Sequence, residues 1–569
     1  MRTFILSILS LYVCMSCAVQ PTSKSYDTVI MNGQLLLPDG QVKKGHILIN
    51  DNRITEIVFS DKNSLKDYNA KTKIDAKDKF VMPGLIDAHA HFISVGRNAS
   101  NLDLLGVSTW KETLVKVKDR VAQAKPGEWI IGRGWHQEKW TDAPAQTVEG
   151  FPVHDELSEI SPNNPIILNH ASGHGILANA KAMEIAGVTG KSAVPEGGDM
   201  ILKPNGEPSG IFQENAENLV YHAYQKFRSQ MSEDEKQKEW YSYLKAAEEL
   251  CLSQGITSVH DAGLSYTDGL KFKALADKNE LNVRLYTMMA DYIVQDLDKK
   301  TLKNYIESTR GNLFFDNTAI KAFMDGALGS RGAWLLEDYS DKPGYRGENV
   351  TPISSIKKTA EIAKELDMQL CVHAIGDRGN REVMNVFEEV AGSEIPARRW
   401  RIEHAQHLNP KDIRRFGELG IIASMQTVHC TSDAPYVLKR LGEERAEEGA
   451  YVWQKLLENH VILANGTDAP IEKINPFRNL YAALTRKSDN AADAFYPSQA
   501  LTRKQALKMY TQGNAYAEFK EKEKGKLEKG YLADIIILDQ NLMECPVEDI
   551  PNTKVILTLV NGEIKYQVK

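Results

Sequence analysis

The sequence predicts an α/β protein, in which strands and helices alternate to build a parallel sheet or barrel. The middle of the chain supports this, because apolar strand-like runs alternate there with helical segments such as residues 354–366 and 411–419. Both chain ends are instead rich in short strands separated by turns. One stretch, about residues 95–235, breaks the alternation with helices, turns and a Pro/Gly-rich zone of its own. We interpret it as an insertion after the first barrel strand.

The two strand-rich ends predict one small sheet domain assembled from residues 27–84 and 520–569, which leaves residues 85–519 for the barrel and its insertion. Near the N-terminus, Asn32-Gly33 and residues 50–52 each lie between apolar runs, and both predict hairpins. Near the C-terminus, apolar runs at 535–538 and 555–560 precede Asn561-Gly562. Chain termini usually lie close together at a surface, so a composite domain is expected.

The composition is that of an ordinary soluble globular protein. The chain has 569 residues, 42% hydrophobic and 25% charged, with a net charge of −7, and these values exclude disordered, collagen-like and coiled-coil classes. The sequence has no basic stripe, so no nucleic-acid partner is expected. The alternating charges of residues 520–524 are interpreted as a solvated surface. After residue 20, no apolar run approaches the roughly 18 residues that a spanning helix needs.

The first seventeen residues predict a secretory signal peptide. Arg2 precedes a short apolar run at residues 4–13, which is too short to span a membrane. Ser16 directly before Cys17 resembles the cleavage box of bacterial lipoproteins, whose cysteine is lipidated after processing. We therefore expect a periplasmic or cell-envelope protein, anchored to the membrane as a lipoprotein through Cys17. A plain signal peptide cleaved nearby is the alternative.

The placement of a few polar side chains points to a metal site. His89 and His91 follow an apolar run and leave the same side of an extended segment. His373, His404 and Asp468 follow three further strand-like runs. The carboxyl ends of barrel strands converge on one face, so these side chains are expected to meet there. Neutral imidazoles with a carboxylate suit Zn²⁺ or a similar divalent ion.

The sequence resembles the amidohydrolase superfamily and, within it, the YtcJ-like branch. The matching segments run in order from about residue 27 to the C-terminus: residues 83–91, 132–135, 255–261, 325–331, 373–377, 402–405, 466–470 and 530–534. The resemblance implies a distorted (β/α)8 TIM-like barrel with an insertion after strand 1, plus a small β-sandwich-like domain formed by both chain ends. The eight strands would then end at His89 and His91, His260, near Tyr286, Lys321, His373, His404, Met425 and Asp468.

The same resemblance implies a ligand set that holds one or two divalent metal ions, with Zn²⁺ as the first candidate: His89, His91, Lys321, His373, His404 and Asp468. In many superfamily members a strand-4 lysine is carboxylated by CO₂ and bridges two metals. Lys321 lies in the apolar run 319–325, where burial would depress its pKa and favour the neutral amine. The alternative is a buried lysine paired with Asp325 or another acid, and a mononuclear site built from fewer ligands stays open.

Three further residues are candidates for substrate binding: Trp135, His174 and His429. Trp135 would form an aromatic wall of the pocket, with core packing as the competing account. His174 lies in a Gly-His segment similar to one in the family, and an exposed loop position is the alternative. His429 follows strand 7, in a loop where relatives usually have a proline at the position of Thr427.

These residues predict a metal-dependent amidohydrolase that uses activated water to hydrolyse non-peptide C–N bonds in linear or cyclic amides. Asp468 would act as the general acid/base that moves a proton from water to the leaving nitrogen. The alternatives are an esterase, lactonase or isomerase on the same metal site, or a catalytically inactive lipid-anchored binding protein. The expected partners are a small-molecule substrate, a membrane through the lipid anchor, and a second copy in a homodimer.

Overall fold

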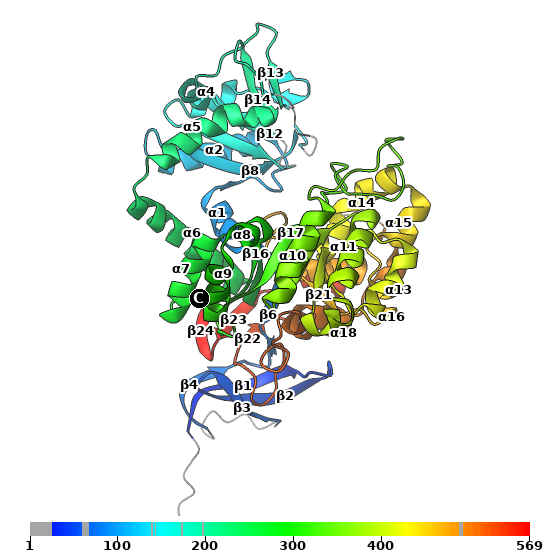
Figure 1. Cartoon of the computed structure of the whole chain (residues 1–569). Helices are drawn as coiled ribbons and strands as arrows, with labels where there is room; N and C mark the ends of the chain where they lie inside the picture. The colour runs from blue at the N-terminus through cyan, green and yellow to red at the C-terminus, as the bar shows by residue number, and fades with distance from the viewer. Residues whose placement is uncertain are drawn as a thin grey trace, which may run out of the picture.

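The computed structural model describes residues 25–59, 68–137, 140–142, 144–171, 175–195, 198–488 and 493–568. It contains a barrel in the middle, a sheet built from both chain ends below it, and a separate lobe above it (Figure 1). The predicted signal peptide and Cys17 lie outside the described residues. Within the described ranges, no helix is both long and apolar enough to cross a membrane.

Eight parallel strands form the barrel, in the order β21-β20-β19-β18-β17-β16-β15-β6. This arrangement confirms the predicted α/β barrel fold. In chain order the strands are β6 (Leu85–Ala90), β15 (Ile256–Leu264), β16 (Arg284–Ala290), β17 (Phe315–Phe323), β18 (Gln369–Ala374), β19 (Arg401–His404), β20 (Ile422–Met425) and β21 (Leu463–Asn465). The predicted ends at His404 and Met425 are those of β19 and β20, whereas β15 runs past His260 to Leu264.

Helices connect and cover the strands (Figure 1). The helices of the barrel are α1 (Phe92–Ser100), α6 (Glu233–Ser253), α7 (Tyr266–Asp277), α8 (Asp291–Asp296), α9 (Lys299–Thr309), α10 (Ile353–Glu365), α11 (Asp377–Val390), α12 (Ile395–Arg398), α13 (Pro410–Glu418), α14 (Thr427–Leu441), α15 (Glu443–Gly449), α16 (Trp453–Glu458), α17 (Pro476–Thr485), α18 (Arg503–Lys508) and α19 (Asn514–Ala517). A five-residue π-helix, η5 (Met509–Gly513), joins α18 to α19. The predicted helices at 354–366 and 411–419 are α10 and α13.

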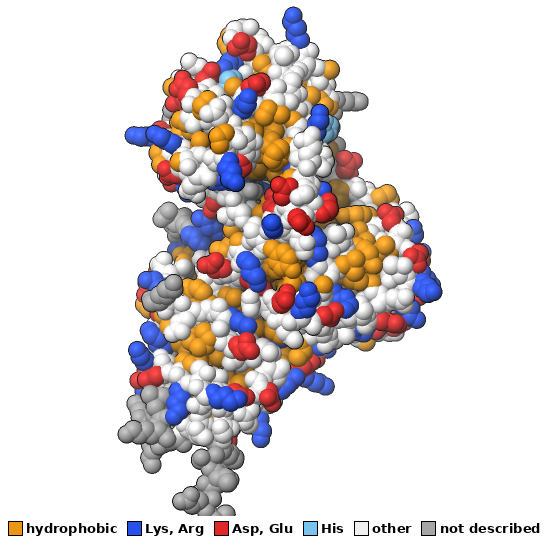
Figure 2. Space-filling model, turned by 90° about the vertical axis from the view of Figure 1, so that its left-hand side faces the viewer, with side chains coloured by type: hydrophobic (Ala, Val, Ile, Leu, Met, Phe, Trp, Pro, Cys, Tyr) orange, Lys and Arg blue, Asp and Glu red, His pale blue; other side chains and the backbone are white. Residues whose placement is uncertain are grey.

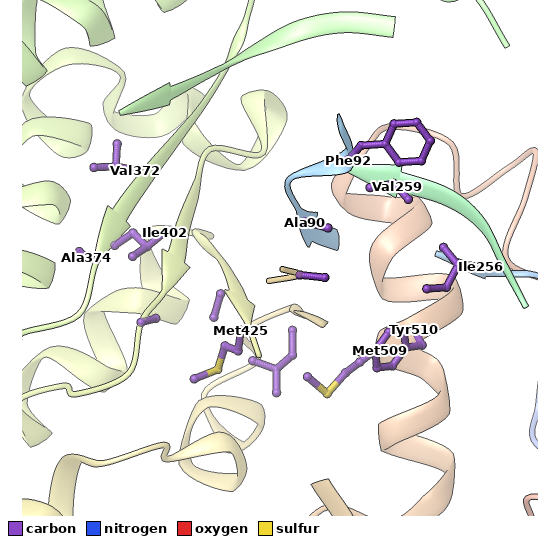
Figure 3. Packing of buried hydrophobic residues seen from close by; sticks show 14 of the residues in the cluster. Ala90, Phe92, Ile256, Val259, Val372, Ala374, Ile402, Met425, Met509 and Tyr510 are labelled. Atoms are coloured by element: carbon purple, nitrogen blue, oxygen red, sulfur yellow. The ribbon is translucent and has the colours of Figure 1, made fainter. Parts of the chain in front are cut away.

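The core lies between the strands and these helices. Figure 3 shows side chains that point into this layer from the strands and from η5: Ile256, Val259, Val372, Ala374, Ile402, Met425, Met509 and Tyr510. All of them are buried. Because the same strands present polar residues to the inside of the barrel, the apolar layer fixes their positions from outside.

The barrel closes where β21 meets β6. The Asp468 amide donates to the His89 carbonyl (2.7 Å), and the His91 amide donates to the Ala469 carbonyl (2.8 Å). The Asn514 side-chain amide donates to carbonyls on both strands, those of Ile86 and Asn465. These bonds hold the last strand against the first at the end of the barrel that contains His89, His91 and Asp468.

The sheet below the barrel joins both ends of the chain, as predicted. Its strand order is β24-β23-β22-β5-β1-β2-β3, and β4 pairs with β1. The strands are β1 (Ser25–Leu36), β2 (Val42–Asn50), β3 (Arg53–Val58), β4 (Asn69–Asp75), β5 (Phe80–Pro83), β22 (Ile535–Leu538), β23 (Val555–Val560) and β24 (Glu563–Gln567). The antiparallel pairing of β5 with β22 links the two ends. The predicted hairpin at residues 50–52 joins β2 to β3.

The predicted hairpin at Asn32-Gly33 is wrong. β1 continues through these residues, and the register of its pairing with β2 shifts between Ile30 and Gly33, which marks a β-bulge. Asn32 adopts a positive φ of 56° there. A Cβ atom on Gly33 would lie 2.6 Å from a methyl group of Val81. The Asn-Gly pair therefore forms a β-bulge, at which Gly33 packs closely against β5, and not a hairpin turn.

The solvated-surface prediction for residues 520–524 is wrong at Lys524, which is 6% exposed. Its ammonium group contacts the Glu518 carboxylate at 2.8 Å and donates to the Ser258 hydroxyl at 2.8 Å. His260 lies 3.5 Å from the same carboxylate. Alternation of charge along the sequence did not reveal that the chain turns one lysine inward to neutralise a buried glutamate.

The lobe above the barrel is the region between α1 and α6, within the predicted insertion (Figure 1). Its sheet has the order β13-β14-β12-β11-β8-β7, with β7 (Leu102–Asp103), β8 (Ile130–Trp135), β11 (Ile166–His170), β12 (Gly175–Ala178), β13 (Gly198–Leu202) and β14 (Pro208–Glu214). The described part of the lobe also contains a two-stranded hairpin, β9 (Thr147–Val148) and β10 (Phe151–Pro152), a 3-10 helix, η2 (Asn215–Glu217), and the α-helices α2 (Trp110–Gln123), α3 (Asp155–Ile160), α4 (Ala180–Ala186) and α5 (Asn218–Ser229). Figure 2 shows this lobe set off from the body of the molecule by a narrower waist.

Candidate metal centre

One cavity of about 360 Å³ lies at the carboxyl ends of the barrel strands. All six predicted metal ligands line it: His89, His91, Lys321, His373, His404 and Asp468. The other lining residues are Phe323, Ala327, Leu328, Ile375, Gln406, His429, Asp433, Tyr436, Ile471 and Glu472. Residues from six of the eight strands or the loops that follow them thus meet at one place, as the convergence of strand ends predicts.

Asp468 lies at the centre of this group. One of its carboxylate oxygens is 3.3 Å from Nε2 of His91 and 3.7 Å from Nε2 of His89, and the other is 3.6 Å from Nε2 of His429. The ligand atoms of His89, His91 and Asp468 all lie within 4.8 Å of one another, and so do those of His404, His429 and Asp468. Asp468 therefore lies between two groups of potential metal-binding atoms.

His373, His404 and Lys321 complete the cluster. The ring centroids of His404 and His373 are 4.5 Å apart, and those of His404 and His89 are 4.7 Å apart. Nζ of Lys321 lies 3.4 Å from Nε2 of His89. Nε2 of His373 and Oδ1 of Asp468 are buried and have no hydrogen-bond partner among the described residues. Buried polar atoms normally have partners, so this donor set fits a divalent cation such as Zn²⁺.

Two imidazoles of the cluster are oriented by residues that the sequence did not single out. Nδ1 of His89 lies 2.5 Å from a Glu403 carboxylate oxygen, and Nδ1 of His404 lies 2.6 Å from the amide oxygen of Gln426. Each ring donates Nδ1–H to an oxygen, which leaves the Nε2 lone pair free for a metal. Arg401 pairs with the other Glu403 oxygen at 2.6 Å. The sequence did contain a signal for Glu403. Arg401 and Glu403 are two charged residues two positions apart in a buried strand, so both point to its inward face.

Burial sets the charge states of these groups. It lowers the pKa of His89 to about 4 and that of His373 to about 3, and the neighbouring Lys321 charge acts in the same direction. Burial also lowers the pKa of the Lys321 amine. For Asp468, burial raises the pKa, but His91 and the other nearby imidazoles hold it well below its usual value. Neutral His89 and His373 imidazoles beside an ionised carboxylate are the protonation states that a divalent metal requires.

Unusual backbone conformations orient two side chains of the site, those of His404 and Asp468. His404 and Asp468 have φ values of 74° and 56°, in the left-handed region that residues with side chains rarely adopt. Arg401 and Glu403 already use the inward positions of β19, so strict alternation would point His404 away from the barrel. The left-handed turn brings it into the cavity instead. Strained backbone conformations of this kind cluster at functional sites, where contacts with the surrounding structure hold them in place.

The suggested pairing of Lys321 with Asp325 is wrong. The Asp325 carboxylate accepts hydrogen bonds from the backbone amides of Trp334, Ile375 and Gly376, at 2.8, 2.9 and 2.8 Å. Burial raises the pKa of Asp325 to about 7 in spite of these donors. Arg331, which also follows β17, pairs with Asp341 and not with Asp325. Asp325 thus holds the loop after β18, directly beyond His373.

The three substrate-binding candidates have different outcomes. Trp135 does not line the cavity: it is 1% exposed in the core of the insertion, and its indole N–H donates to the Leu168 carbonyl at 2.9 Å. The competing account of core packing therefore holds for Trp135, because β8 lies inside the sheet of the lobe. His174 lies outside the described residues. His429 lines the cavity, and Thr427 begins α14 with its hydroxyl donating to the Asn479 carbonyl at 2.7 Å.

Comparison with known proteins finds a match to the family model described as "Amidohydrolase family" over residues 72–566. The chain is 33% identical to the protein LONG AFTER FAR-RED 3 of Arabidopsis thaliana, over 95% of this chain and 91% of that protein. It is 30% identical to the putative amidohydrolase YtcJ of Bacillus subtilis, over 87% of this chain and 90% of that protein. The N-substituted formamide deformylase of Arthrobacter pascens is 24% identical over the same shares of the two chains.

A solved structure supports the same assignment. The crystal structure of an uncharacterised metal-dependent hydrolase from Pyrococcus furiosus matches with a TM-score of 0.70 and 27% sequence identity. The match covers 91% of this chain and all of that one. The similarity therefore extends over the barrel, the terminal sheet and the insertion together.

Proposed function

The chain belongs to the amidohydrolase family of metal-dependent hydrolases, and from this premise we propose that it hydrolyses a non-peptide C–N bond in a small linear or cyclic amide. The observation that carries the proposal is the convergence of His89, His91, Lys321, His373, His404 and Asp468 on one cavity. The likeness to an N-substituted formamide deformylase supports an amide as the substrate.

We propose that one or two Zn²⁺ ions bind here, held by the four histidines, Asp468 and a carboxylated Lys321. A divalent ion bound at such a site supplies a nucleophile from water at neutral pH and polarises a carbonyl group. Burial of the Lys321 side chain supports the carboxylated form, because the lowered pKa favours the neutral amine that reacts with CO₂.

Asp468 moves the proton in this scheme. The oxygen of water forms a bond to the carbonyl carbon, and one proton of that water passes to the Asp468 carboxylate. The C–N bond then breaks, and the proton passes to the leaving nitrogen, so that an acid and an amine are released. The apolar side chains of Phe323, Leu328 and Ile471 line the cavity and would exclude water from one side of the substrate. A cavity of about 360 Å³ favours a small molecule.

The test is a metal analysis followed by a substrate panel. The purified protein is expected to contain stoichiometric zinc and to hydrolyse N-substituted formamides or cyclic amides. The substitution Asp468→Asn should reduce kcat about 10²-fold or more. A folded protein that binds no divalent metal would contradict the proposal. Turnover of esters or lactones but no amide would replace it with the esterase hypothesis.

We propose further that the protein is a lipoprotein of the cell envelope. The apolar run at residues 4–13 and the Ser16-Cys17 pair support this location. Expressed in a bacterium that processes lipoproteins, the full chain should enter the membrane fraction and need detergent for extraction. The Cys17→Ala variant should fail to be lipidated. Wild-type protein that is recovered without detergent would contradict the proposed anchor.

A further inference from the structure

His429 is held differently from the other imidazoles of the cavity. It lies in the first turn of α14, and 7% of its surface is exposed. Its Nε2 atom has no hydrogen-bond partner among the described residues, and the carboxylate oxygen of Asp468 is 3.6 Å away. A buried imidazole nitrogen without a partner calls for an explanation.

The contact on the other side of the ring favours one tautomer. Nδ1 of His429 lies 3.0 Å from the side-chain amide nitrogen of Gln406. An amide nitrogen only donates hydrogen bonds, so Nδ1 accepts and the proton of the neutral ring lies on Nε2. His89 and His404 have the opposite arrangement, because oxygens of Glu403 and Gln426 face their Nδ1 atoms.

This difference in the position of the ring proton distinguishes histidines that can bind a metal from a histidine that donates a hydrogen bond. A metal binds a nitrogen lone pair, which His89 and His404 present at Nε2. His429 presents an N–H group at the same position, although proximity alone groups it with His404 and Asp468. The Asp468 oxygen at 3.6 Å is beyond hydrogen-bond distance. The N–H group therefore stays available for an acceptor inside the cavity.

We propose that His429 is not a metal ligand but a catalytic hydrogen-bond donor to the carbonyl oxygen of the substrate, and that Gln406 is the positioning residue that keeps its proton on Nε2. The proposal rests on the proposed amide hydrolysis. When the water oxygen bonds to the carbonyl carbon, the C=O electron pair moves onto the carbonyl oxygen. The Nε2–H group stabilises that negative charge until the pair returns and the C–N bond breaks.

Two substitutions test the proposal. In His429→Ala, kcat for a substrate found in the panel should fall about 10²- to 10³-fold, KM should change little, and zinc stoichiometry should stay the same. In Gln406→Glu, a carboxylate faces Nδ1 and draws the proton to it. This variant should show a similar loss of kcat with unchanged zinc. His222→Ala, at an exposed position on α5, is the control and should match the wild type.

A second readout needs no substrate. In zinc-loaded protein labelled with ¹⁵N-histidine, the His429 signals, identified by their absence in His429→Ala, should show protonated Nε2 and unprotonated Nδ1. Gln406→Glu should exchange the two states. Loss of zinc in His429→Ala, or a protonated Nδ1 in the wild type, would overturn the proposal. If no amide is hydrolysed at all, the function proposed above fails. If amides are hydrolysed and His429→Ala is fully active, only the role of His429 fails.

Discussion

At the scale of single residues, Lys321 carries a free-energy cost that its proposed role would remove. Its side chain is 1% exposed, it lies among imidazoles, and within the described ranges no carboxylate forms an ion pair with its ammonium group. An unpaired buried charge is strongly unfavourable. A group held in this position at such a cost is expected to act in the site, and carboxylation converts the buried cation into a metal-binding anion.

The substitution Lys321→Met tests this interpretation. It keeps the length of the side chain but can neither carry charge nor be carboxylated. Zinc stoichiometry is expected to fall, while the free energy of unfolding of metal-free protein should stay unchanged or rise, because a buried charge is lost. Wild-type protein equilibrated with ¹³C-bicarbonate and zinc should show a carbamate signal that the variant lacks.

Lys524→Met is the matched control, since Lys524 is also a buried lysine but is paired with Glu518. This variant should retain its zinc and lose about 3–5 kcal/mol of stability, because a buried carboxylate is left unpaired. Equal stability losses in the two variants would contradict the distinction between a functional and a structural lysine.

The side chains that gather in the candidate metal site could be predicted from the sequence, and the residues that orient them could not. His89, His373 and Asp468 stand out because each follows an apolar run, where a polar side chain is unexpected since its burial costs free energy. Gln406 and Gln426 are ordinary loop residues in the sequence, and only the folded chain places their amide groups beside His429 and His404. Local patterns report which side of a strand a residue faces, but not which distant side chain it meets.

At the scale of elements, the seam between β21 and β6 depends on a close approach. Gly466 follows β21, and a Cβ atom there would lie 2.4 Å from the His89 amide nitrogen and 2.7 Å from the Asp87 carboxylate. That carboxylate accepts hydrogen bonds from the amide and hydroxyl of Thr467, at 3.0 and 2.6 Å. The glycine thus lets the loop that holds Asp468 contact the strand that holds His89.

Gly466→Ala is therefore expected to push the two strands apart. We expect a loss of about 1–3 kcal/mol in the free energy of unfolding, together with weaker zinc binding, because His89 and Asp468 separate. Urea unfolding and a chelator competition assay measure the two effects. Gly175→Ala, whose Cβ atom would meet its nearest neighbour at 3.5 Å, is the control. Wild-type zinc affinity in Gly466→Ala would show that the seam does not set the geometry of the site.

At the opposite end of the barrel, Glu518 and Lys524 form a buried ion pair. Burial raises the pKa of Glu518, but Lys524 and His260 outweigh it and lower the pKa to about 2, against a usual value of 4.5. Because the pKa is lower in the folded state, the pair stabilises the protein fully above pH 4.5, and this contribution is lost as the pH falls toward 2.

Glu518→Gln removes this titration. At pH 6 the wild type should be more stable than the variant, and the difference should shrink by roughly 3 kcal/mol as the pH falls from 4.5 toward 2. Urea unfolding at a series of pH values measures it, and Glu388→Gln on the exposed face of α11 controls for nonspecific effects. A difference that does not vary with pH would contradict the lowered pKa.

At the scale of the whole molecule, the fold followed from the distribution of strand-rich and alternating segments along the chain. Short-range features were less informative. Asn32-Gly33 has the composition of a turn, yet β1 continues through it as a bulge, because β1 pairs with β2 on both sides of it, with β4 before it and with β5 after it. The position of the insertion was evident from the break in alternation, whereas its structure was not, because its sheet mixes parallel and antiparallel strands.

The insertion has the features of an independently folding unit. Two apolar clusters, one containing Trp135 and the other Trp129, are built from residues between Leu102 and Val220. A segment with its own core usually folds by itself. It follows strand 1 at the active-site end of the barrel, and a Cβ atom on Gly106 would lie 3.6 Å from Nζ of Lys473. Lys473 directly follows Ile471 and Glu472, which line the cavity. The insertion is thus placed to restrict which substrates enter.

Replacing residues 102–230 with a flexible linker should therefore separate stability from selectivity. The shortened protein is expected to unfold cooperatively and to keep its zinc, because the barrel ligands and core lie outside the deleted segment. On the substrate panel, KM should rise and discrimination between bulky and small amides should weaken, with a smaller change in kcat. Residues 102–230 expressed alone should give a cooperative thermal transition. A shortened enzyme with the selectivity of the wild type would show that the barrel loops alone determine which substrates are accepted.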